Sequence, residues 1–485
     1  MSKEVREQQP QLLWKHFADL NAVPRPSKKE ERVRAFMVAF GKSHDLEVIE
    51  DAIGNVIIRK PATSGMEDRE SIIMQSHLDM VHQKNNDTDF DFLTQGIDMF
   101  VQGDIIKARG TTLGADNGIG VAAIMAVLSS TDIAHPAIEA LFTVDEETGM
   151  TGAKELDKTI LTSKILLNLD TEEDDEIDIG CAGGVDVTAT KTYPLEAVDG
   201  NYISKKITVK GLNGGHSGMD IIKGLGNANK MITRLVDAMQ KRGAVHFQSL
   251  NGGSLRNAIP REAVAVVSLR KSDWEQMRNT FNRCKDAIQD EYAALEEHLS
   301  IAIEAIENAE VLTESDSREL VYCLLGIHNG VYRMSPEIDG LVETSNNLAR
   351  VTLENGELQI ACLTRSSVKS SKTDLSSSIV AVMKLAQMDA KLSGDYPGWQ
   401  PNANSTMLDI IKAKYTELFD HEPRVVACHA GLECGLLGER YPGLDMISFG
   451  PNIRRAHSPD EYVEITSVQK FWKLLLEVLK EIPKA

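Results

Sequence analysis

The stretch IEALFTVDEETG, residues 138–149, joins an apolar run to three consecutive carboxylates, Asp145, Glu146 and Glu147. The run at 138–144 predicts a buried β-strand. Three like charges directly after such a strand repel one another unless a cation lies against them, and no Lys or Arg follows them before Lys154. The partner is therefore a metal ion, a substrate amine or a basic side chain from elsewhere in the chain.

Similar apolar runs at 71–76 and 164–169 also predict buried strands, and residues 117–130 predict a buried helix between two of the strands. Strands alternating with helices indicate an α/β fold with a largely parallel sheet. The same texture returns near the end of the chain, where DMISFG at 445–450 predicts another strand. We therefore expect one α/β domain built from both ends of the chain.

The middle of the chain differs, with alternating strands and amphipathic helices expected at 225–242 and 273–298. This pattern predicts an α+β domain inserted into the first one. Residues 254–270 weakly resemble residues 345–365, which contain an Asn355-Gly356 hairpin turn; the similarity indicates either an internal repeat or a chance match. The predicted boundaries are 1–186 and 399–485 for the first domain and 187–398 for the insertion.

Composition excludes several classes of protein. A formal net charge of −20 opposes binding to nucleic acid, whose phosphates need a basic surface. No apolar run is long enough to span a membrane, and the first residues lack a signal-peptide pattern, so we expect a cytoplasmic protein. The six cysteines show no CxxC spacing, which indicates reduced thiols and no thiolate zinc site. Any metal must be bound by histidines and carboxylates.

Candidate ligands follow the predicted strands or open the helix that comes next. Ligands bind at the carboxyl ends of the strands in open α/β sheets, so these segments should meet in one crevice. Each residue alone has an ordinary explanation: a hydrogen-bonded histidine, a helix N-cap or a solvated acidic pair. Nitrogen and oxygen donors in this number suit two zinc ions, or cobalt or manganese in their place. The candidates are His77, Asp79, Asp116, Glu146, Glu147, Asp170 and His457.

Two other motifs do not match the functional signatures that they resemble. GADNGIG has glycines at 114, 118 and 120, which is not the GxGxxG spacing of a dinucleotide site. GGHSGM, in the inserted domain, lacks the final glycine of the GxSxG nucleophile elbow. Dehydrogenase and serine-hydrolase functions are therefore disfavoured.

The motifs resemble those of the bacterial aminoacyl-histidine dipeptidases, a group within the aminoacylase/carboxypeptidase-like family of dizinc peptidases. The resemblance covers essentially the whole chain, and it implies a catalytic domain interrupted by a lid domain. It also implies that the lid is a doubled unit, which would explain the weak repeat. The blocks are QSHLDMV, ARGTTLGADNGIG, VDEETGMTGA, LNLDTEE, GLNGGHSGMDI, LRNAIPRE, YPGWQPNANS, HAGLECG and SFGPNIRRAHSPDE.

The resemblance also implies roles. His77 and Asp170 would hold one zinc ion, Glu147 and His457 the other, and Asp116 would bridge the two. Asp79 would orient His77, and Glu146 would be the general base in the hydrolysis of dipeptides with free ends, including Xaa-His and β-alanyl-histidine. The lid histidine of the family, which stabilises the oxyanion, matches His216. A homodimer is left open.

Three further residues are candidates for substrate binding. Arg365 is either a surface arginine or one that grips a carboxylate with two hydrogen bonds. Glu433 can accept an α-amine, and Asn257 can line the same cleft. Two rival functions are a related deacylase or tripeptidase, and a metal-stabilised binding protein without catalysis. A binding protein without catalysis would have no use for Glu146, because this carboxylate is not needed as a metal ligand.

Overall fold

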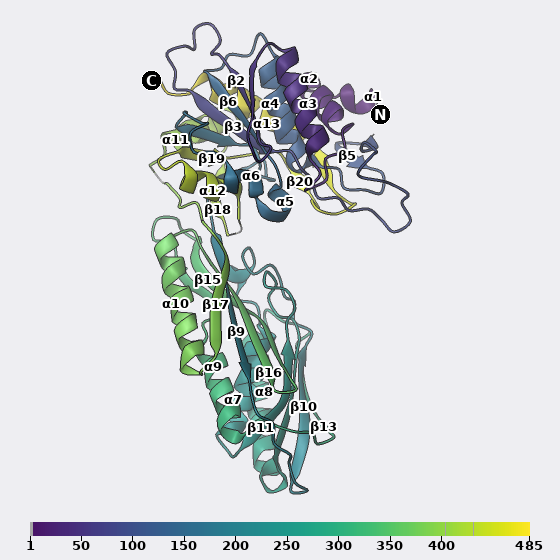
Figure 1. Ribbon diagram of the computed structural model, residues 1–485, viewed down its shortest axis with the longest axis vertical. Helices are drawn as coiled ribbons and strands as arrows, with labels where there is room; N and C mark the ends of the chain where they lie inside the picture. The colour runs from purple at the N-terminus through teal and green to yellow at the C-terminus, as the bar shows by residue number, and fades with distance from the viewer. Residues whose placement is uncertain (1–2, 403, 430) are drawn as a thin grey trace. The chain divides into compact units, whose positions relative to one another are not determined.

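The chain forms two compact units, each a β-sheet with helices packed on it (Figure 1). The structure is a computed structural model that describes residues 3–402, 404–429 and 431–485. The first unit consists of Met1–Gly180, Trp399–Ala427 and Leu432–Ala485, and the second of Cys181–Gly398 and Cys428–Gly431. The break expected after residue 186 thus falls after Gly180, and the short segment Cys428–Gly431 groups with the second unit.

An eight-stranded mixed sheet forms the centre of the first unit, with the order β1-β2-β6-β3-β7-β19-β8-β18. Strands β3, β6, β7 and β19 run parallel, and every residue of β3, β6 and β7 is buried. Their carboxyl ends meet at one edge, as the apolar runs predict. The strands are β1 (Glu47–Glu50), β2 (Val56–Lys60), β3 (Ile72–His77), β6 (Ile138–Thr143), β7 (Ile165–Asn168), β8 (Glu176–Cys181), β18 (Arg424–Cys428) and β19 (Asp445–Ser448).

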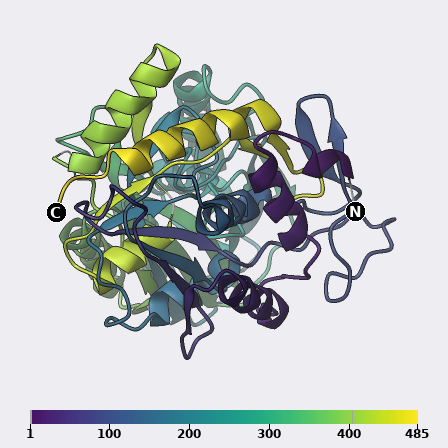
Figure 2. The same cartoon turned by 90° about the horizontal axis from the view of Figure 1, so that it is seen from above.

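Helix α4 (Ala115–Ser129) is buried at every position from 117 to 128, which explains its apolar sequence, and it packs on β3. The C-terminal helix α13 is the long yellow helix in Figure 2. None of the helices in the described ranges is both long and apolar enough to cross a membrane. The other helices of this unit are α1 (Lys3–Arg6), α2 (Gln11–Leu20), α3 (Glu31–Ser43), α5 (Glu146–Gly149), α6 (Thr151–Glu155), α11 (Thr406–Phe419), α12 (Glu433–Arg440) and α13 (Ile465–Lys480).

A small antiparallel sheet in the first unit has the order β20-β21-β5-β4. Strand β5 leads through a short loop into α4, and β21 pairs with β5. The loop between β20 and β21 is therefore held close to the chain that enters α4. The strands are β4 (Met99–Gln102), β5 (Ile105–Ala108), β20 (Ile453–Arg454) and β21 (Tyr462–Glu464).

The second unit is built on a nine-stranded sheet with the order β13-β10-β12-β11-β15-β16-β9-β17, with β14 paired to β15. Two halves repeat one topology: β13-β10-β12-β11 has the same arrangement as β17-β9-β16-β15. The strands are β9 (Gly183–Thr192), β10 (Tyr202–Lys210), β11 (Val245–Gly252), β12 (Ala263–Arg270), β13 (Ser300–Ile306), β14 (Gly330–Met334), β15 (Val342–Glu354), β16 (Glu357–Ser366) and β17 (Asp389–Tyr396).

Helices α7 (Ala228–Gln240), α8 (Trp274–Tyr292), α9 (Glu314–Gly326) and α10 (Lys369–Leu385) pack in a row, α8 on α7, α7 on α9 and α9 on α10. The weak sequence repeat falls on equivalent segments, the loop and strand that end at β12 and the β15–β16 hairpin. That hairpin turns at Asn355 and Gly356, whose φ angles of 51° and 80° suit the expected turn.

The helix expected at 273–298 ends early, at Tyr292. The following residues turn inward because Glu296, only 2% exposed, accepts hydrogen bonds from the backbone N–H groups of Asn213 and Gly226. The hydrogen bonds to this buried carboxylate stabilise the turn more than further helical hydrogen bonds would.

Candidate active site

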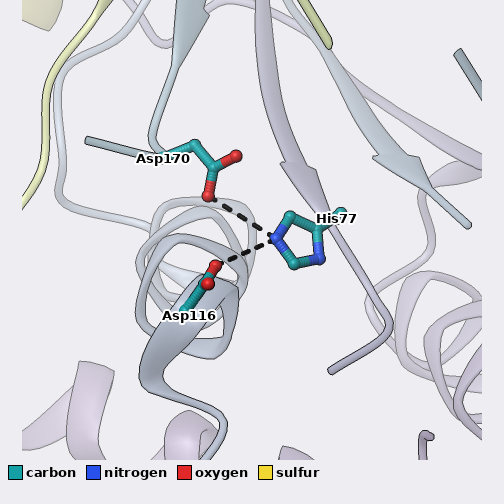
Figure 3. A group of neighbouring side chains, drawn as sticks. All are labelled: His77, Asp116 and Asp170. Atoms are coloured by element: carbon teal, nitrogen blue, oxygen red, sulfur yellow. Dashed lines mark hydrogen bonds and ion pairs between the residues drawn. The ribbon is translucent and has the colours of Figure 1, made fainter. Parts of the chain in front are cut away.

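His77 is the last residue of β3, and its two ring nitrogens face different partners. Nδ1 lies 3.4 Å from Asp79 Oδ1 and 3.2 Å from the Asp79 carbonyl oxygen. Nε2 lies 3.1 Å from Asp116 Oδ1 and 3.6 Å from Asp170 Oδ1 (Figure 3). A proton on Nδ1 would satisfy Asp79 and leave the lone pair of Nε2 facing two carboxylate oxygens. That tautomer suits a cation bound between them.

The other oxygen of Asp116 faces a second histidine. His457 Nε2 lies 3.1 Å from Asp116 Oδ2 and 3.0 Å from Glu147 Oε2. Asp116 thus offers one oxygen toward His77 and the other toward His457. A carboxylate in this position can bridge two metal ions.

Three groups of ligand atoms lie close enough to hold a metal, with all atoms in a group within 4.8 Å of one another. Glu147 Oε1 is buried and has no hydrogen-bond partner within the described part of the protein, which suits coordination of an ion there. All donors are imidazole nitrogens or carboxylate oxygens, which suits zinc, cobalt or manganese. The groups are His77, Asp116 and Asp170; His77, Glu146 and Glu147; and Asp116, Glu147 and His457.

The three consecutive carboxylates have three different surroundings. Asp145 adopts a left-handed backbone with φ of 56°, and its side chain accepts hydrogen bonds from Thr148 and Thr151. It is therefore a structural residue of the turn. Glu146 and Glu147 begin α5, and both appear in the groups of candidate ligand atoms.

Asp79, which is fully buried, ties this turn to β3. Its Oδ1 accepts from the backbone N–H of Glu146 at 3.0 Å, and its Oδ2 from that of Glu147 at 3.3 Å. Burial would raise the pKa of Asp79, but the hydrogen bond with His77 prevails and the pKa is lowered. Asp79 is therefore a charged anchor for both His77 and the carboxylate turn.

Two of the site residues lie away from the strand ends of the large sheet. Asp116 is in the first turn of α4, and its ψ of 110° is not helical. His457 lies in the loop between β20 and β21 of the small sheet, whereas the sequence predicted that it follows a strand of the large sheet. Two sheets therefore contribute to the site.

The carboxylates raise the basicity of both histidines. Hydrogen bonds with Asp116 and Glu147 raise the pKa of His457 to about 11. Burial lowers the pKa of His77, but Asp170 and Asp116 outweigh it and the pKa is raised well above its usual range. In the absence of metal both imidazoles therefore carry a proton at neutral pH.

The negative charge of Glu146, unlike the positive charge of the two histidines, is poorly compensated by its surroundings. Burial raises its pKa well above the usual range; His77 acts in the opposite direction, and Asp170 and Glu433 add to the rise. A carboxyl group with a raised pKa among metal ligands is suited to accept and return a proton.

Glu433 begins α12 and is only 1% exposed. Its Oε2 accepts hydrogen bonds from Gln75 Nε2 at 2.7 Å and from Thr143 Oγ1 at 2.6 Å. Its Oε1 is buried without a partner, and burial raises its pKa to about 7. The side chain is thus fixed below the carboxyl ends of β3 and β6.

The remaining candidates, His216, Asn257 and Arg365, belong to the second unit. His216 Nδ1 accepts hydrogen bonds from the backbone N–H groups of Gly218 and Met219 at 3.2 and 3.1 Å. The ring proton must then sit on Nε2, which makes Nε2–H a donor.

Arg365 is not a surface residue, because it is only 5% exposed. Its Nη1 donates to Tyr396 Oη at 2.9 Å, while its Nε is buried without a partner. Asn257 is exposed, and its backbone carbonyl accepts from the N–H of Ser217 at 2.7 Å.

Sequence reasoning missed several buried polar residues near these sites. Glu461 follows His457 by four positions, a spacing that could have identified it, whereas Arg25 lies in a segment without any motif.

His429 Nε2 lies 2.8 Å from Ser345 Oγ, and burial, Arg365 and His216 together lower its pKa to about 3. Burial also raises the pKa of Glu172 to about 8, and Asp116 contributes to the rise.

The fold and the site together define a class: two-unit α/β proteins in which histidines and carboxylates gather at the carboxyl edge of a mixed sheet. Comparison with known proteins gives the family. The model of the peptidase family M20/M25/M40 matches residues 73–481.

A curated relative, the cytosol non-specific dipeptidase of Escherichia coli, is 43% identical over 481 residues, which cover 99% of both chains. The solved aminoacylhistidine dipeptidase from Vibrio alginolyticus is 41% identical with a TM-score of 0.96, and the match covers 100% of this chain and 99% of that one. The aminopeptidase PepT from Bacillus cereus, at 16% identity and a TM-score of 0.57 over 98% and 99% of the two chains, shares the fold. This chain belongs to the peptidase family M20/M25/M40, which confirms the family that its motifs predict.

Proposed function

We propose that this chain is a cytoplasmic metal-dependent dipeptidase acting on dipeptides with free amino and carboxyl ends, including Xaa-His and β-alanyl-histidine. The observation that carries the proposal is the position of Asp116, whose two oxygens face His77 and His457 at 3.1 Å each. The dipeptidase names of the two full-length relatives support this choice of substrate.

Two zinc ions are proposed as the cofactor, with cobalt or manganese as substitutes. His77 and Asp170 would hold one ion, Glu147 and His457 the other, and Asp116 would bridge them. The partnerless Oε1 of Glu147 and the short distances between these donors support this assignment.

When bound, the metal ions supply a water of lowered pKa and polarise the scissile carbonyl. Glu146 would take the proton from that water and return it to the leaving amine. Its raised pKa suits both halves of this transfer, because the carboxyl group must hold the proton between the two steps. Asp79 would keep His77 in the tautomer that leaves Nε2 free.

The second unit would bind the charged and polar groups of the dipeptide. Arg365 is proposed for the carboxylate, because its buried guanidinium has an Nε without a partner. His216 is proposed as the donor to the oxyanion, through Nε2–H, and Asn257 as a lining residue.

Glu433 remains the proposed partner of the α-amine. The unpartnered Oε1 supports this role, but at 1% exposure the amine must displace neighbouring side chains to reach it. Glu433→Gln would keep the contacts with Gln75 and Thr143 through its carbonyl oxygen and remove the charge. A higher KM for dipeptides, with unchanged KM for N-acetylated substrates, is the result that the role requires.

Metal analysis combined with a substrate panel tests the function. The protein as isolated and after chelation would be assayed on β-alanyl-histidine, other dipeptides, tripeptides and C-amidated dipeptides. We expect hydrolysis of the free dipeptides, loss of activity on chelation and recovery with zinc, cobalt or manganese. Undiminished turnover by metal-free protein would contradict the mechanism, and preference for tripeptides or acylated amino acids would replace the proposed substrate. Sedimentation velocity on the same sample would show whether the chain forms a homodimer.

A further inference from the structure

Glu461 is a buried carboxylate that the proposed metal ligands leave without a role. It is only 2% exposed and lies just before β21. Its Oε2 accepts from the backbone N–H of Leu113 at 2.8 Å and of Gly114 at 3.0 Å. Its Oε1 accepts from the N–H of Ala115 at 2.7 Å and of Asp116 at 3.3 Å. One side chain thus holds four consecutive amides that end at Asp116.

These amides open helix α4, and the first N–H groups of a helix have no partner within the helix. The N-cap residue, Gly114, has no side chain to satisfy them and adopts a left-handed φ of 69°. A carboxylate at this position is also favoured by the helix dipole. Because Glu461 caps the helix, Asp116 need not turn back as an N-cap, and its carboxylate remains free to face the histidines.

Arg25 binds the same loop through a backbone carbonyl group. This side chain is only 1% exposed. Its Nη2 donates to the carbonyl of Gly114 at 2.5 Å, and its Nη1 donates to the carbonyls of Leu78 and Asp79 at 3.1 Å each. The chain entering α4 is therefore joined both to the loop after β3 and to the loop before β21.

The loop before β21 also carries a candidate ligand. His457 lies four residues before Glu461, and its Nε2 reaches Asp116 Oδ2 at 3.1 Å. The segment that contains His457 and Glu461 therefore contacts Asp116 twice. The imidazole of His457 lies against the Asp116 carboxylate, and the carboxylate of Glu461 accepts from the Asp116 backbone N–H.

We infer that Glu461 is a positioning residue for metal binding, whose carboxylate fixes the backbone at Asp116 so that both oxygens stay directed at His77 and His457. This inference rests on the proposed metal-dependent function. Removing the carboxylate frees four backbone amides and allows Asp116 to rotate toward them, which takes a shared ligand away from both metals.

The test measures Co²⁺ binding to the full-length protein, so that it does not depend on catalysis. Glu461→Gln keeps the size of the side chain but places an NH₂ group against two backbone N–H donors. We expect its Co²⁺ affinity to fall by about 10–100-fold, the usual effect of losing a partner that orients metal ligands, and the visible absorption of the bound Co²⁺ to change. Asp460→Asn is the matched control, because Asp460 is adjacent, acidic and exposed, and it should bind Co²⁺ like the parent.

Each result has a definite meaning. A parent protein that binds no Co²⁺ rejects the proposed function itself. A parent that binds two ions, together with a Glu461→Gln variant of equal affinity and spectrum, overturns the inference alone. If Glu461→Gln does not fold, as judged by circular dichroism, Glu461→Asp replaces it, because its shorter side chain keeps the charge but cannot reach all four amides. Parent-like affinity in folded Glu461→Asp, or failure of both variants to fold, would assign Glu461 to folding only and overturn the inference.

Discussion

The candidate-site histidines of the two units have pKa values that are shifted in opposite directions. In the first unit, carboxylates raise the pKa values of His77 and His457, so that both rings are charged until a metal replaces the proton. In the second unit, burial and the charge of Arg365 lower the pKa values of His216 and His429, so that both rings are neutral. A histidine of the first unit thus holds a proton that a metal must displace, whereas a histidine of the second unit is a neutral hydrogen-bond donor.

This difference follows from the charges that surround each ring. The carboxyl edge of the first sheet gathers anionic groups and attracts cations. His216 and Arg365 offer an N–H donor and the permanent positive charge of the guanidinium, which suit anionic or polar parts of a substrate. The comparison predicts that metal binding depends on the first unit alone, whereas the second unit affects substrate affinity and catalysis.

The largest expected effect separates two adjacent carboxylates of the first unit. Glu146→Gln should keep its metals and lose roughly 10²–10⁴ in kcat, the usual contribution of a positioned general base. Glu147→Ala should lose metal, because it removes a ligand and its unpartnered oxygen. Metal content and kcat measured on both variants decide between the roles. A metal-poor Glu146→Gln protein or a fully loaded Glu147→Ala protein would show that the two roles are reversed.

A smaller effect is expected in the second unit. Arg365→Ala should raise KM for free-acid dipeptides by about 10–100-fold, the range for losing a hydrogen bond to a charged group, and should leave metal content unchanged. C-amidated dipeptides should respond little. Arg350→Ala is the control, because Arg350 is exposed on the neighbouring strand β15. Equal losses on acids and amides would remove Arg365 from carboxylate recognition.

Metal binding should release protons at neutral pH, because a metal ligand must be a neutral imidazole and both histidines of the site have raised pKa values. Raising the pH removes the competing protons, so affinity should increase by about tenfold per pH unit for each proton displaced. Calorimetry in two buffers of different ionisation enthalpy measures the number released. His216→Gln should not change that number, and a binding heat independent of buffer would contradict the predicted charge of His77 and His457.

The smallest effect concerns Asp178, a buried carboxylate of β8 that is not among the metal ligands. Burial raises its pKa to about 7, so the folded state binds a proton more tightly than the unfolded state, and stability falls as pH rises from about 4 to 7. Asp178→Asn keeps an acceptor for Thr171 and should raise the melting temperature at pH 8 by on the order of 2 °C, with little change at pH 4.

Asp175 provides the contrasting control for this experiment. A hydrogen bond from Arg424 lowers the pKa of this exposed carboxyl group, so Asp175→Asn should not stabilise the protein at pH 8. Equal melting temperatures for Asp178→Asn and the parent at pH 8 would mean that the Asp178 carboxylate is not destabilising there.

The sequence alone indicated which segments form the first unit and which of its residues are candidate metal ligands. Parallel strands buried on both faces must be continuous apolar runs, so the runs just before His77, Glu146 and Asp170 identify both the strands and the shared edge. The positive φ angles at Asn355 and Gly356 were likewise predictable, since that turn is a local property of two residues.

Only the tertiary structure decided which way each side chain faces. Asp116 meets His77 and His457 from positions 39 and 341 residues away, through the packing of a helix and a second sheet. Asp145 faces two threonines although it belongs to the same acidic run as Glu147, and the amides beside Asp116 are held by Glu461 from a distant loop. Periodicity reports the face of one element, whereas these contacts depend on how separate elements pack, and no spacing along the chain records that.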